Sequence, residues 1–328
     1  MILLNSNDIS EVYGMKDAIA SVKKAFRLSY EQKCLVPQRT ILPANGGKDS
    51  LLFMPASCAE TGTAAMKIIG VYSGNPGKGL PACPASILLF DESTGMVRAM
   101  LDGTYVTQLR TGAASGAAFD LLAKEDCTTG ALFGTGGQAE TQLEAMLCAR
   151  KLSKVYVYSR NEKNRRDFAL KMEKKLADYG AEIIPAADPS QAVKDADLII
   201  AVTPSQTPVF NAAEVKPGCT ISGVGSYKYE MQELDPALFA RASGIYFDSR
   251  EAVLAESGDI IRPLEAGVIS PESFTGDLGG VITGDVPGRK DDSDIIVFKT
   301  VGIAIQDLVT TSEIYDKAAA AKTGMYWE

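Results

Sequence analysis

The chain of 328 residues contains no histidine. This absence excludes a Ser-His-Asp triad, a histidine-ligated metal and a histidine general base. Any proton transfer must therefore use Lys, Asp, Glu, Tyr, Cys or water. The absence also removes the usual chemistry of lactate and malate dehydrogenases, in which a histidine takes the proton of the alcohol. We expect no metal site in this chain.

Excess basic charge and long apolar runs are also missing. The net charge of −8 argues against nucleic acid or an anionic membrane surface as the main partner. No apolar run reaches transmembrane length, and the first residues lack the basic segment of a signal peptide. The six cysteines are scattered without a C-x-x-C spacing, which predicts reduced thiols in a cytoplasmic protein.

The first part of the chain predicts a β-rich unit. An amphipathic helix is expected over 15–30, preceded by a short strand or loop over 5–13. Short strands are expected at 38–42, 50–54, 64–72, 85–90 and 96–101, with a hairpin turn at 91–95. Because an open meander of this size leaves an edge or a face exposed, we expect this unit to form a homodimer. A helix follows over 104–123, and its small residues at 111–118 imply close approach to another helix or to a ligand.

From residue 128 the pattern changes to alternating strands and helices. Strands are expected at 130–133, 155–159, 182–185, 198–203, 220–224, 245–247 and 294–298. This alternation predicts an α/β fold with a doubly wound parallel Rossmann sheet. A last helix, ending near 322, is expected to return to the first part of the chain, followed by a loose tail over 323–328. The resulting domains are a substrate-binding and dimerisation α+β domain of residues 1–118 and 302–328, and an inserted dinucleotide-binding domain of residues 119–301.

The residues Gly134, Gly136 and Ala139 fit the pattern G-x-G-x-x-A between an expected strand and an expected helix. The first glycine permits a tight turn, and the second leaves room for a pyrophosphate. The small third residue lets the helix pack closely, and the helix N-terminus offers N–H groups to phosphate. The pattern predicts a dinucleotide site.

The end of the second Rossmann strand indicates which dinucleotide is bound. NAD-specific sites carry an acidic residue there, for the ribose 2′-hydroxyl. This chain has Ser159 and Arg160 instead, a hydroxyl and a guanidinium that suit a 2′-phosphate. We therefore expect NADP(H) to be preferred over NAD(H), although Arg160 in solvent or stacked on adenine would fit either cofactor.

Several segments together resemble the ornithine cyclodeaminase/mu-crystallin family over about residues 36 to 307. In order along the chain they are Val36–Thr40, Phe53–Ala56, Met66–Ile69, Gln108–Ser115, Gly134–Ala139 and Phe298–Ala304. The resemblance implies a nicotinamide cofactor, an imino or amino acid substrate, and a Rossmann domain beside a dimerising substrate domain.

The resemblance also implies the site residues. The substrate carboxylate would be held by Arg39, Lys67 and Arg110, since fixed cations bind and orient a carboxylate. Lys67 lies in an apolar run, where a strand lysine needs a partner, whereas Arg39 alone would also suit a surface ion pair. Cofactor contacts are expected from Gly134, Gly136, Gly137, Gln138, Ala139, Ser159, Arg160, Thr203, Val224 and Thr300.

The departures from the family pattern indicate the reaction. Cyclodeaminases of the family carry a glutamate for the side-chain amine where this chain has Leu52, and an aspartate proposed as acid/base where it has Tyr227. Met231 stands where they carry a lysine. This part of the chain looks more like the family's pyrroline-2-carboxylate and ketimine reductases.

We therefore expect an NAD(P)H-dependent reductase of a small, cyclic or linear α-imino acid. Lys67 or Tyr227 would donate the proton, and Tyr227 would equally suit a wall beside the substrate ring. An amino-acid dehydrogenase such as an alanine dehydrogenase, an ornithine cyclodeaminase, and a non-catalytic crystallin-like binding protein remain as alternatives.

Overall fold

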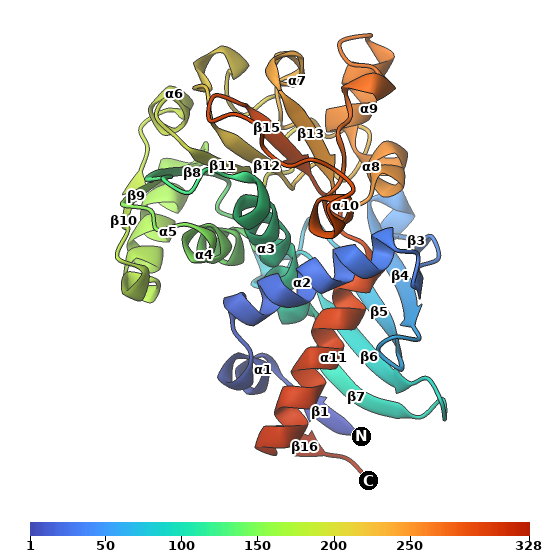
Figure 1. Ribbon diagram of the computed structural model, residues 1–328. Coiled ribbons are helices and arrows are strands. Elements are labelled where there is room, and N and C mark those ends of the chain that lie inside the picture. Colours follow the sequence, from blue (N-terminus) through green and yellow to red (C-terminus); the bar gives the residue numbers. More distant parts are fainter. The chain divides into compact units, whose positions relative to one another are not determined.

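The structure is a computed structural model that describes all residues, 1–328 (Figure 1). Packing divides the chain into two compact units. Unit 1 consists of Met1–Thr111 and Ile303–Glu328, and unit 2 consists of Gly112–Gly302. Unit 2 is thus an insertion between two segments of unit 1. The domain boundaries expected from the sequence, at 118/119 and 301/302, stay a prediction.

Unit 1 is built on one sheet, called sheet A. Its strands are β1 (Ile2–Leu4), β2 (Cys34–Leu35), β3 (Thr40–Ala44), β4 (Asp49–Cys58), β5 (Thr63–Val71), β6 (Ala85–Asp91), β7 (Val97–Asp102) and β16 (Met325–Tyr326). They lie in the order β16-β1-β7-β6-β5-β4-β2, with β3 also paired to β4. All pairs are antiparallel except β1 with β7. Short 3-10 helices, η1 (Asn45–Gly47) and η2 (Pro76–Lys78), lie in its loops.

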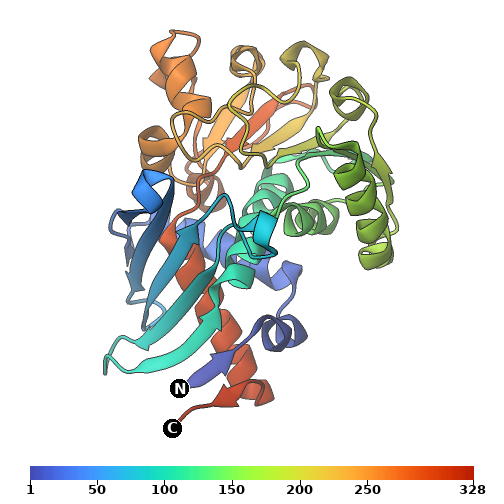
Figure 2. The same cartoon turned by 180° about the vertical axis from the view of Figure 1, so that it is seen from behind.

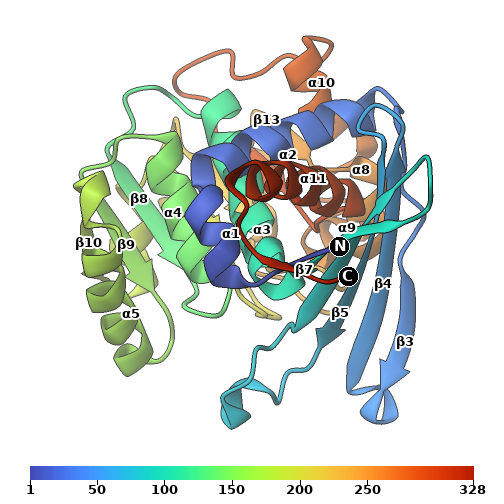
Figure 3. The ribbon, with the colours of Figure 1, turned by 90° about the horizontal axis from the view of Figure 1, so that it is seen from below.

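Helices cover only one face of sheet A. The helices of this unit are α1 (Ser6–Val12), α2 (Met15–Tyr30) and α11 (Ala304–Ala321). Helix α11 packs against β4, β5 and β6 and against α2 (Figure 3). The strand residues that face it alternate with outward residues, as the twofold period of a strand requires: Leu52, Met54, Lys67, Ile69 and Ile87 are all buried.

The two ends of the chain differ from expectation. Residues 6–12 form helix α1 rather than a strand or loop, because Asn5 and Asp8 form a reciprocal capping box at its start. The tail is not loose, because Met325 and Tyr326 pair with β1 as strand β16. The terminal amino group also donates to the carbonyl oxygen of Trp327.

Unit 2 contains an all-parallel sheet, called sheet B. Its strands are β8 (Thr129–Phe133), β9 (Lys154–Tyr158), β10 (Glu182–Pro185), β11 (Leu198–Ala201), β12 (Thr220–Gly223), β13 (Gly244–Phe247), β14 (Gly276–Asp277) and β15 (Ile296–Lys299). Their order is β10-β9-β8-β11-β12-β15-β13-β14. The order reverses between β8 and β11, the point at which doubly wound sheets bind ligands. The predicted Rossmann sheet is confirmed.

Helices cover both faces of sheet B, which explains why every residue of β8, β11, β12, β13 and β15 is buried. The helices are α4 (Ala139–Ala149), α5 (Glu162–Lys175), α6 (Pro189–Val193), α7 (Pro236–Arg241), α8 (Arg250–Glu256), α9 (Gly258–Glu265) and α10 (Leu278–Thr283), with 3-10 turns η3 (Ala177–Tyr179), η4 (Ala212–Glu214) and η5 (Pro271–Ser273). Leu132 packs in one core with α4 and α5, whereas its neighbours Ala131 and Phe133 pack in the other with α6, α7, α8 and α9.

Helix α3 (Gly103–Leu122) runs from unit 1 into unit 2, and its small residues allow close helix packing. A Cβ atom on Gly112 would lie 2.4 Å from the carbonyl oxygen of Thr141 in α4. The close approach implied by the sequence is therefore made here to another helix. All six cysteines are free thiols. None of the helices is both long and apolar enough to cross a membrane.

Candidate active site

The loop after β8 is shaped by Gly134. This residue has φ of +115°, a conformation that side chains other than glycine rarely adopt. A Cβ atom there would also lie 2.5 Å from the carbonyl oxygen of Val202. Gly134 is thus required by the fold of the turn itself.

Gly136 has a different role from Gly134. A Cβ atom on Gly136 would meet no atom within 4 Å, so nothing in the protein requires a glycine there. Helix α4 begins next to it without a side-chain cap at Gln138, and Ala139 is fully buried. An open approach to an uncapped helix N-terminus fits a pyrophosphate, which supports the predicted dinucleotide site.

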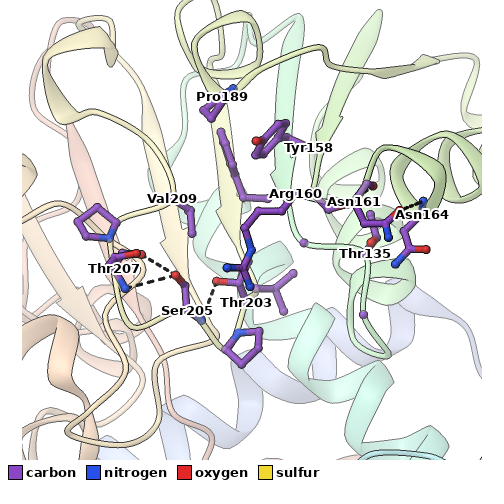
Figure 4. Close-up of a pocket in the computed structure, with 17 residues that line it drawn as sticks. Thr135, Tyr158, Arg160, Asn161, Asn164, Pro189, Thr203, Ser205, Thr207 and Val209 are labelled. Carbon is purple, nitrogen blue, oxygen red and sulfur yellow. Dashed lines mark hydrogen bonds between the residues drawn. The ribbon is translucent and has the colours of Figure 1, made fainter. Parts of the chain in front are cut away.

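A cavity of about 540 Å³ opens beside this loop (Figure 4). Among the expected cofactor contacts, it is lined by Gly134, Gly136, Ser159, Arg160 and Thr203. The other residues that line it are Phe133, Thr135, Tyr158, Asn161, Asn164, Pro189, Val202, Pro204, Ser205, Thr207, Pro208 and Val209. The cavity therefore lies along the carboxyl ends of β8, β9 and β11, as a dinucleotide site in this fold requires.

Arg160 is the cation of this cavity. Its side chain extends into the cavity toward Thr203 (Figure 4), and it forms no ion pair. The hydroxyl of Ser159 donates to the carbonyl oxygen of Asn161, 3.1 Å away. No acidic residue lines the cavity.

The other expected contacts of unit 2 lie outside the lining of this cavity. Thr300 is buried, and its hydroxyl donates to Oδ2 of Asp248 at 2.6 Å. The same carboxyl oxygen accepts the N–H groups of Val301 and Gly302, so Asp248 shapes the segment after β15. Gly137, Gln138, Ala139 and Val224 also lie outside the lining.

Tyr227 lies half-buried in the loop that follows β12. The ammonium group of Lys228 is 5.8 Å from the centre of its ring. A catalytic role for Tyr227 stays a prediction.

In unit 1 the structure brings Lys67 and Arg110 together on one carboxylate. Lys67 is in β5, Arg110 in α3 and Asp307 in α11, and all three are buried. The distance from Nζ of Lys67 to Oδ2 of Asp307 is 2.5 Å, and that from Nε of Arg110 to Oδ1 is 3.0 Å. Two cations thus share one counter-ion.

Opposing effects set the pKa of Lys67. Burial and the positive charge of Arg110 lower the pKa of Lys67 to about 7, against the opposing effect of Asp307. Arg39, half-buried between β2 and β3, lowers it further, so Arg39 lies within electrostatic reach of Lys67. Burial alone would raise the pKa of Asp307, but Arg110 and Lys67 hold it below its usual value. Lys67 can therefore exchange a proton near neutral pH.

The sequence reading missed Asp307 and its neighbour Gln306. The carboxamide oxygen of Gln306 accepts from Arg110 at 3.3 Å and from the N–H of Ile303 at 2.9 Å. Its Nε2 is buried without an acceptor. The signal was available, because Gln306 and Asp307 interrupt an apolar helix and buried polar groups need partners.

No group of three or more Cys, Asp or Glu side chains is placed to hold a metal ion. The chemistry of this site rests on cations, one buried carboxylate and amide groups. It can bind an anionic group and supply a proton close to it.

Comparison with known proteins gives the family. The profile described as "Ornithine cyclodeaminase/mu-crystallin family" matches residues 1–322. A Delta(1)-pyrroline-2-carboxylate reductase of Bacillus cereus is 32% identical over 324 residues, which are 99% of this chain and 98% of that protein.

Two solved structures are similar over the whole chain. That of the Thermococcus litoralis Delta(1)-pyrroline-2-carboxylate reductase, in complex with NADH and L-proline, has a TM-score of 0.95 and 37% identity and covers 100% of both chains. That of an archaeal alanine dehydrogenase dimer with bound NAD has a TM-score of 0.91 and 31% identity, covering 100% of this chain and 99% of the other. The chain described here belongs to the ornithine cyclodeaminase/mu-crystallin family.

Proposed function

We propose that this chain is an NAD(P)H-dependent reductase that converts a small cyclic α-imino acid, such as pyrroline-2-carboxylate, to the amino acid. The observation that carries the proposal is the buried group of Lys67, Arg110 and Asp307, in which Lys67 has a pKa of about 7. The Thermococcus litoralis relative is described with NADH and L-proline, the amino acid that this reaction would form.

The substrate carboxylate would pair with the positive charge that Asp307 leaves uncompensated on Lys67 and Arg110. Two cations, Lys67 and Arg110, share the single carboxylate of Asp307, and Arg39 lies within electrostatic reach of Lys67. The unpaired Nε2 of Gln306 adds a neutral donor beside Arg110. A carboxylate accepts from several such donors at once, which fixes its orientation as well as its position.

Lys67 is the proton donor that the geometry favours. With a pKa of about 7 it holds a proton in a large share of molecules at neutral pH and can release it. Its shared counter-ion, Asp307, holds the ammonium group in place. The bound nicotinamide cofactor would supply the hydride to the imine carbon. Tyr227 remains a second candidate for the proton donor, or a side chain that packs beside the substrate ring.

The apolar strand beside Lys67 supports a cyclic imino acid over ornithine as the substrate. Met54 pairs with Lys67 and Leu52 with Ile69 across β4 and β5, and both side chains are apolar. Neither side chain offers a partner for the side-chain amine of ornithine. A substrate with an apolar ring is favoured.

The test is a screen of cofactor oxidation by the purified chain. Pyrroline-2-carboxylate, piperideine-2-carboxylate and pyruvate with ammonia are each supplied with NADPH or NADH. The proposal expects the highest kcat/KM with a cyclic imino acid. Faster reduction of pyruvate with ammonia would instead favour an alanine dehydrogenase, which the similar archaeal dimer makes the second candidate. Ammonia release from ornithine with NAD+, or cofactor binding without any turnover, would also contradict the proposal.

We propose further that NADP(H) is preferred over NAD(H). The support is Arg160, a cation without an ion pair in a cavity that no acidic residue lines. Arg160→Ala should lower kcat/KM with NADPH by about tenfold or more and leave that with NADH nearly unchanged, because a charge-assisted bond to phosphate is lost. Equal losses with both cofactors would contradict this preference.

The chain is also proposed to form a homodimer through the face of sheet A that bears no helix of unit 1 (Figure 2). The strands place apolar side chains on this face, among them Phe53, Ile68, Leu88 and Met100. A shallow apolar cavity of about 350 Å³ lies there, lined by residues such as Pro55, Met66 and Phe90. Apolar surface of this extent marks an interaction site, and the archaeal relative is described as a dimer.

A further inference from the structure

A buried carboxylate, Glu233, joins the ends of two neighbouring strands of sheet B. Its Oε2 accepts the N–H of Thr203 at 2.8 Å and the hydroxyl of the same residue at 3.1 Å. Its Oε1 accepts the N–H of Val224 at 3.1 Å and that of Gly225. Thr203 follows β11, and Val224 and Gly225 follow β12.

The two strand ends held by Glu233 are in direct contact. A Cβ atom on Gly225 would lie 2.0 Å from the carbonyl oxygen of Thr203 and 2.7 Å from Oε2 of Glu233. The two segments therefore meet as backbone against backbone. Glu233 supplies the acceptors that their N–H groups would otherwise lack.

Glu233 is itself held by two further buried charges. Oδ1 of Asp259, in α9, accepts the N–H groups of Glu233 and Leu234 at 2.8 Å and 3.0 Å. Nζ of Lys299, at the end of β15, lies 3.2 Å from Oδ2 of Asp259. Burial raises the pKa of Glu233 to about 7, and Asp259 raises it too, whereas the charge of Lys299 and the backbone donors lower it.

Such a group is costly for stability. Glu233, Asp259 and Lys299 are fully buried, and well-packed apolar side chains are often at least as stabilising as a buried ion pair. A buried charged group beside a cavity is therefore better explained by the geometry it imposes. That geometry concerns Thr203, which lines the cavity in Figure 4.

We propose that Glu233 is a positioning residue for the nicotinamide half of the cofactor, through its clamp on Thr203, Val224 and Gly225. In a doubly wound sheet the pyrophosphate lies at the first glycine loop, and the two nucleotide halves lie over opposite sides of it. The sheet order places β9, which ends before Arg160, on one side of β8, and β11 and β12 on the other. We therefore assign the ends of β11 and β12 to the nicotinamide half, with Thr203 at the border of the cavity that Arg160 enters. The inference rests on the dinucleotide binding that is part of the proposed function.

The test compares two ligands that differ by the nicotinamide. Calorimetry gives the dissociation constants of NADH and of ADP-ribose for the whole chain and for Glu233→Gln. The amide cannot accept all of the N–H groups, so the affinity for NADH should fall by about tenfold or more, while that for ADP-ribose stays within about twofold. A uniform loss for both ligands, or no loss, overturns the proposal.

Asp197→Asn is the matched control. Asp197 also accepts two backbone N–H groups, those of Thr128 and Thr129, but at the amino end of β8. Its loss should lower the melting temperature without changing the ratio of the two affinities. A selective loss of NADH binding in this variant would show that the effect is general and would overturn the proposal.

A second variant tests the same proposal if Glu233→Gln folds poorly. Lys299→Met keeps an aliphatic stem against Gly223 and removes the cation that faces both carboxylates. This variant should reproduce the selective loss of NADH affinity. If the ratio of the affinities for NADH and ADP-ribose is the same as in the wild type, the proposal is overturned. The measured quantity is cofactor affinity, so the proposal on Glu233 does not depend on whether the chain reduces imines. A wild-type chain that binds neither NADH nor ADP-ribose would overturn both this proposal and the proposed cofactor.

Discussion

At the scale of single residues, the candidate site centres on one lysine, Lys67, whose charged neighbours come from two other elements. Lys67 lies in β5, its counter-ion Asp307 in α11, and the neighbouring cation Arg110 in α3. In a chain without histidine, burial and the like charge of Arg110 lower the pKa of Lys67 to about 7, a value that suits the proposed role of proton donor at neutral pH.

Lys67→Met should remove both the proton and one cation while keeping the aliphatic stem in its apolar surroundings. We expect kcat/KM for the imino acid to fall by about 10²- to 10⁴-fold, the usual contribution of a positioned general acid. The measurement is initial-rate kinetics, with Lys16→Met on the exposed side of α2 as control. Unchanged kcat/KM would remove Lys67 from the mechanism.

The pH dependence of kcat/KM tests the balance of charge around Lys67. The donor must be protonated, so kcat/KM should be high below pH 7 and fall as the pH rises through about 7. Asp307 raises the pKa of Lys67, so Asp307→Asn should move this fall to lower pH by about 1–3 units. Asp316→Asn, an exposed change on the same helix, should leave the profile in place. A fall that stays at the wild-type pH in Asp307→Asn contradicts the assignment.

How far single residues could be predicted depends on whether their partners are local. Lys67 was predictable because a lysine in an apolar strand needs a partner, and Asp307 could have been matched to it by the same argument. The role of Glu233 could not be predicted, because it accepts the N–H and the hydroxyl of Thr203, which is 30 positions away in the chain and is brought close only by the folded sheet.

At the scale of elements, the two glycines of the loop after β8 have different roles, one in the fold of the loop and the other in leaving space for a cofactor. Gly134 serves the fold, and Gly136 leaves space that the protein does not use. Gly134→Ala should therefore destabilise the chain by about 1–3 kcal/mol, as expected for a strained backbone.

Gly136→Val should leave the melting temperature nearly unchanged and weaken cofactor binding by about tenfold or more, since a side chain would occupy the pyrophosphate path. Thermal unfolding and calorimetry with NADPH separate the two effects. If Gly136→Val bound NADPH as the wild type does, the pyrophosphate would have to lie elsewhere.

The elements that could be predicted well from the sequence are those whose own residues show a clear apolar pattern. The Rossmann strands and the helix at 15–30 appear where expected, because each is fixed by its own burial pattern. Strand β16 has only two residues and exists through pairing with β1, more than 300 positions away. Helix α1 was missed although its capping box, Asn5 with Asp8, was readable.

At the scale of the whole molecule, the apolar outer face of sheet A predicts the oligomeric state. Ile68→Glu combined with Met100→Glu places two charges on that face, where each native side chain is 38% exposed. The wild type should sediment as a dimer and this variant as a monomer, because a buried charge at an interface is unfavourable. Leu170→Glu, an equally drastic change on the exposed side of α5, is the control and should stay dimeric. A wild-type monomer would contradict the proposed interface.

The measurement that tests the central proposal most directly is the fate of the transferred hydride. Pyrroline-2-carboxylate is incubated with the chain and with NADPH that carries deuterium at C4 of the nicotinamide, on either face in separate reactions. The account predicts that one of the two labelled cofactors gives proline with a single deuterium at Cα, detected by mass spectrometry and NMR. Absence of proline, or unlabelled proline from both cofactors, would contradict it.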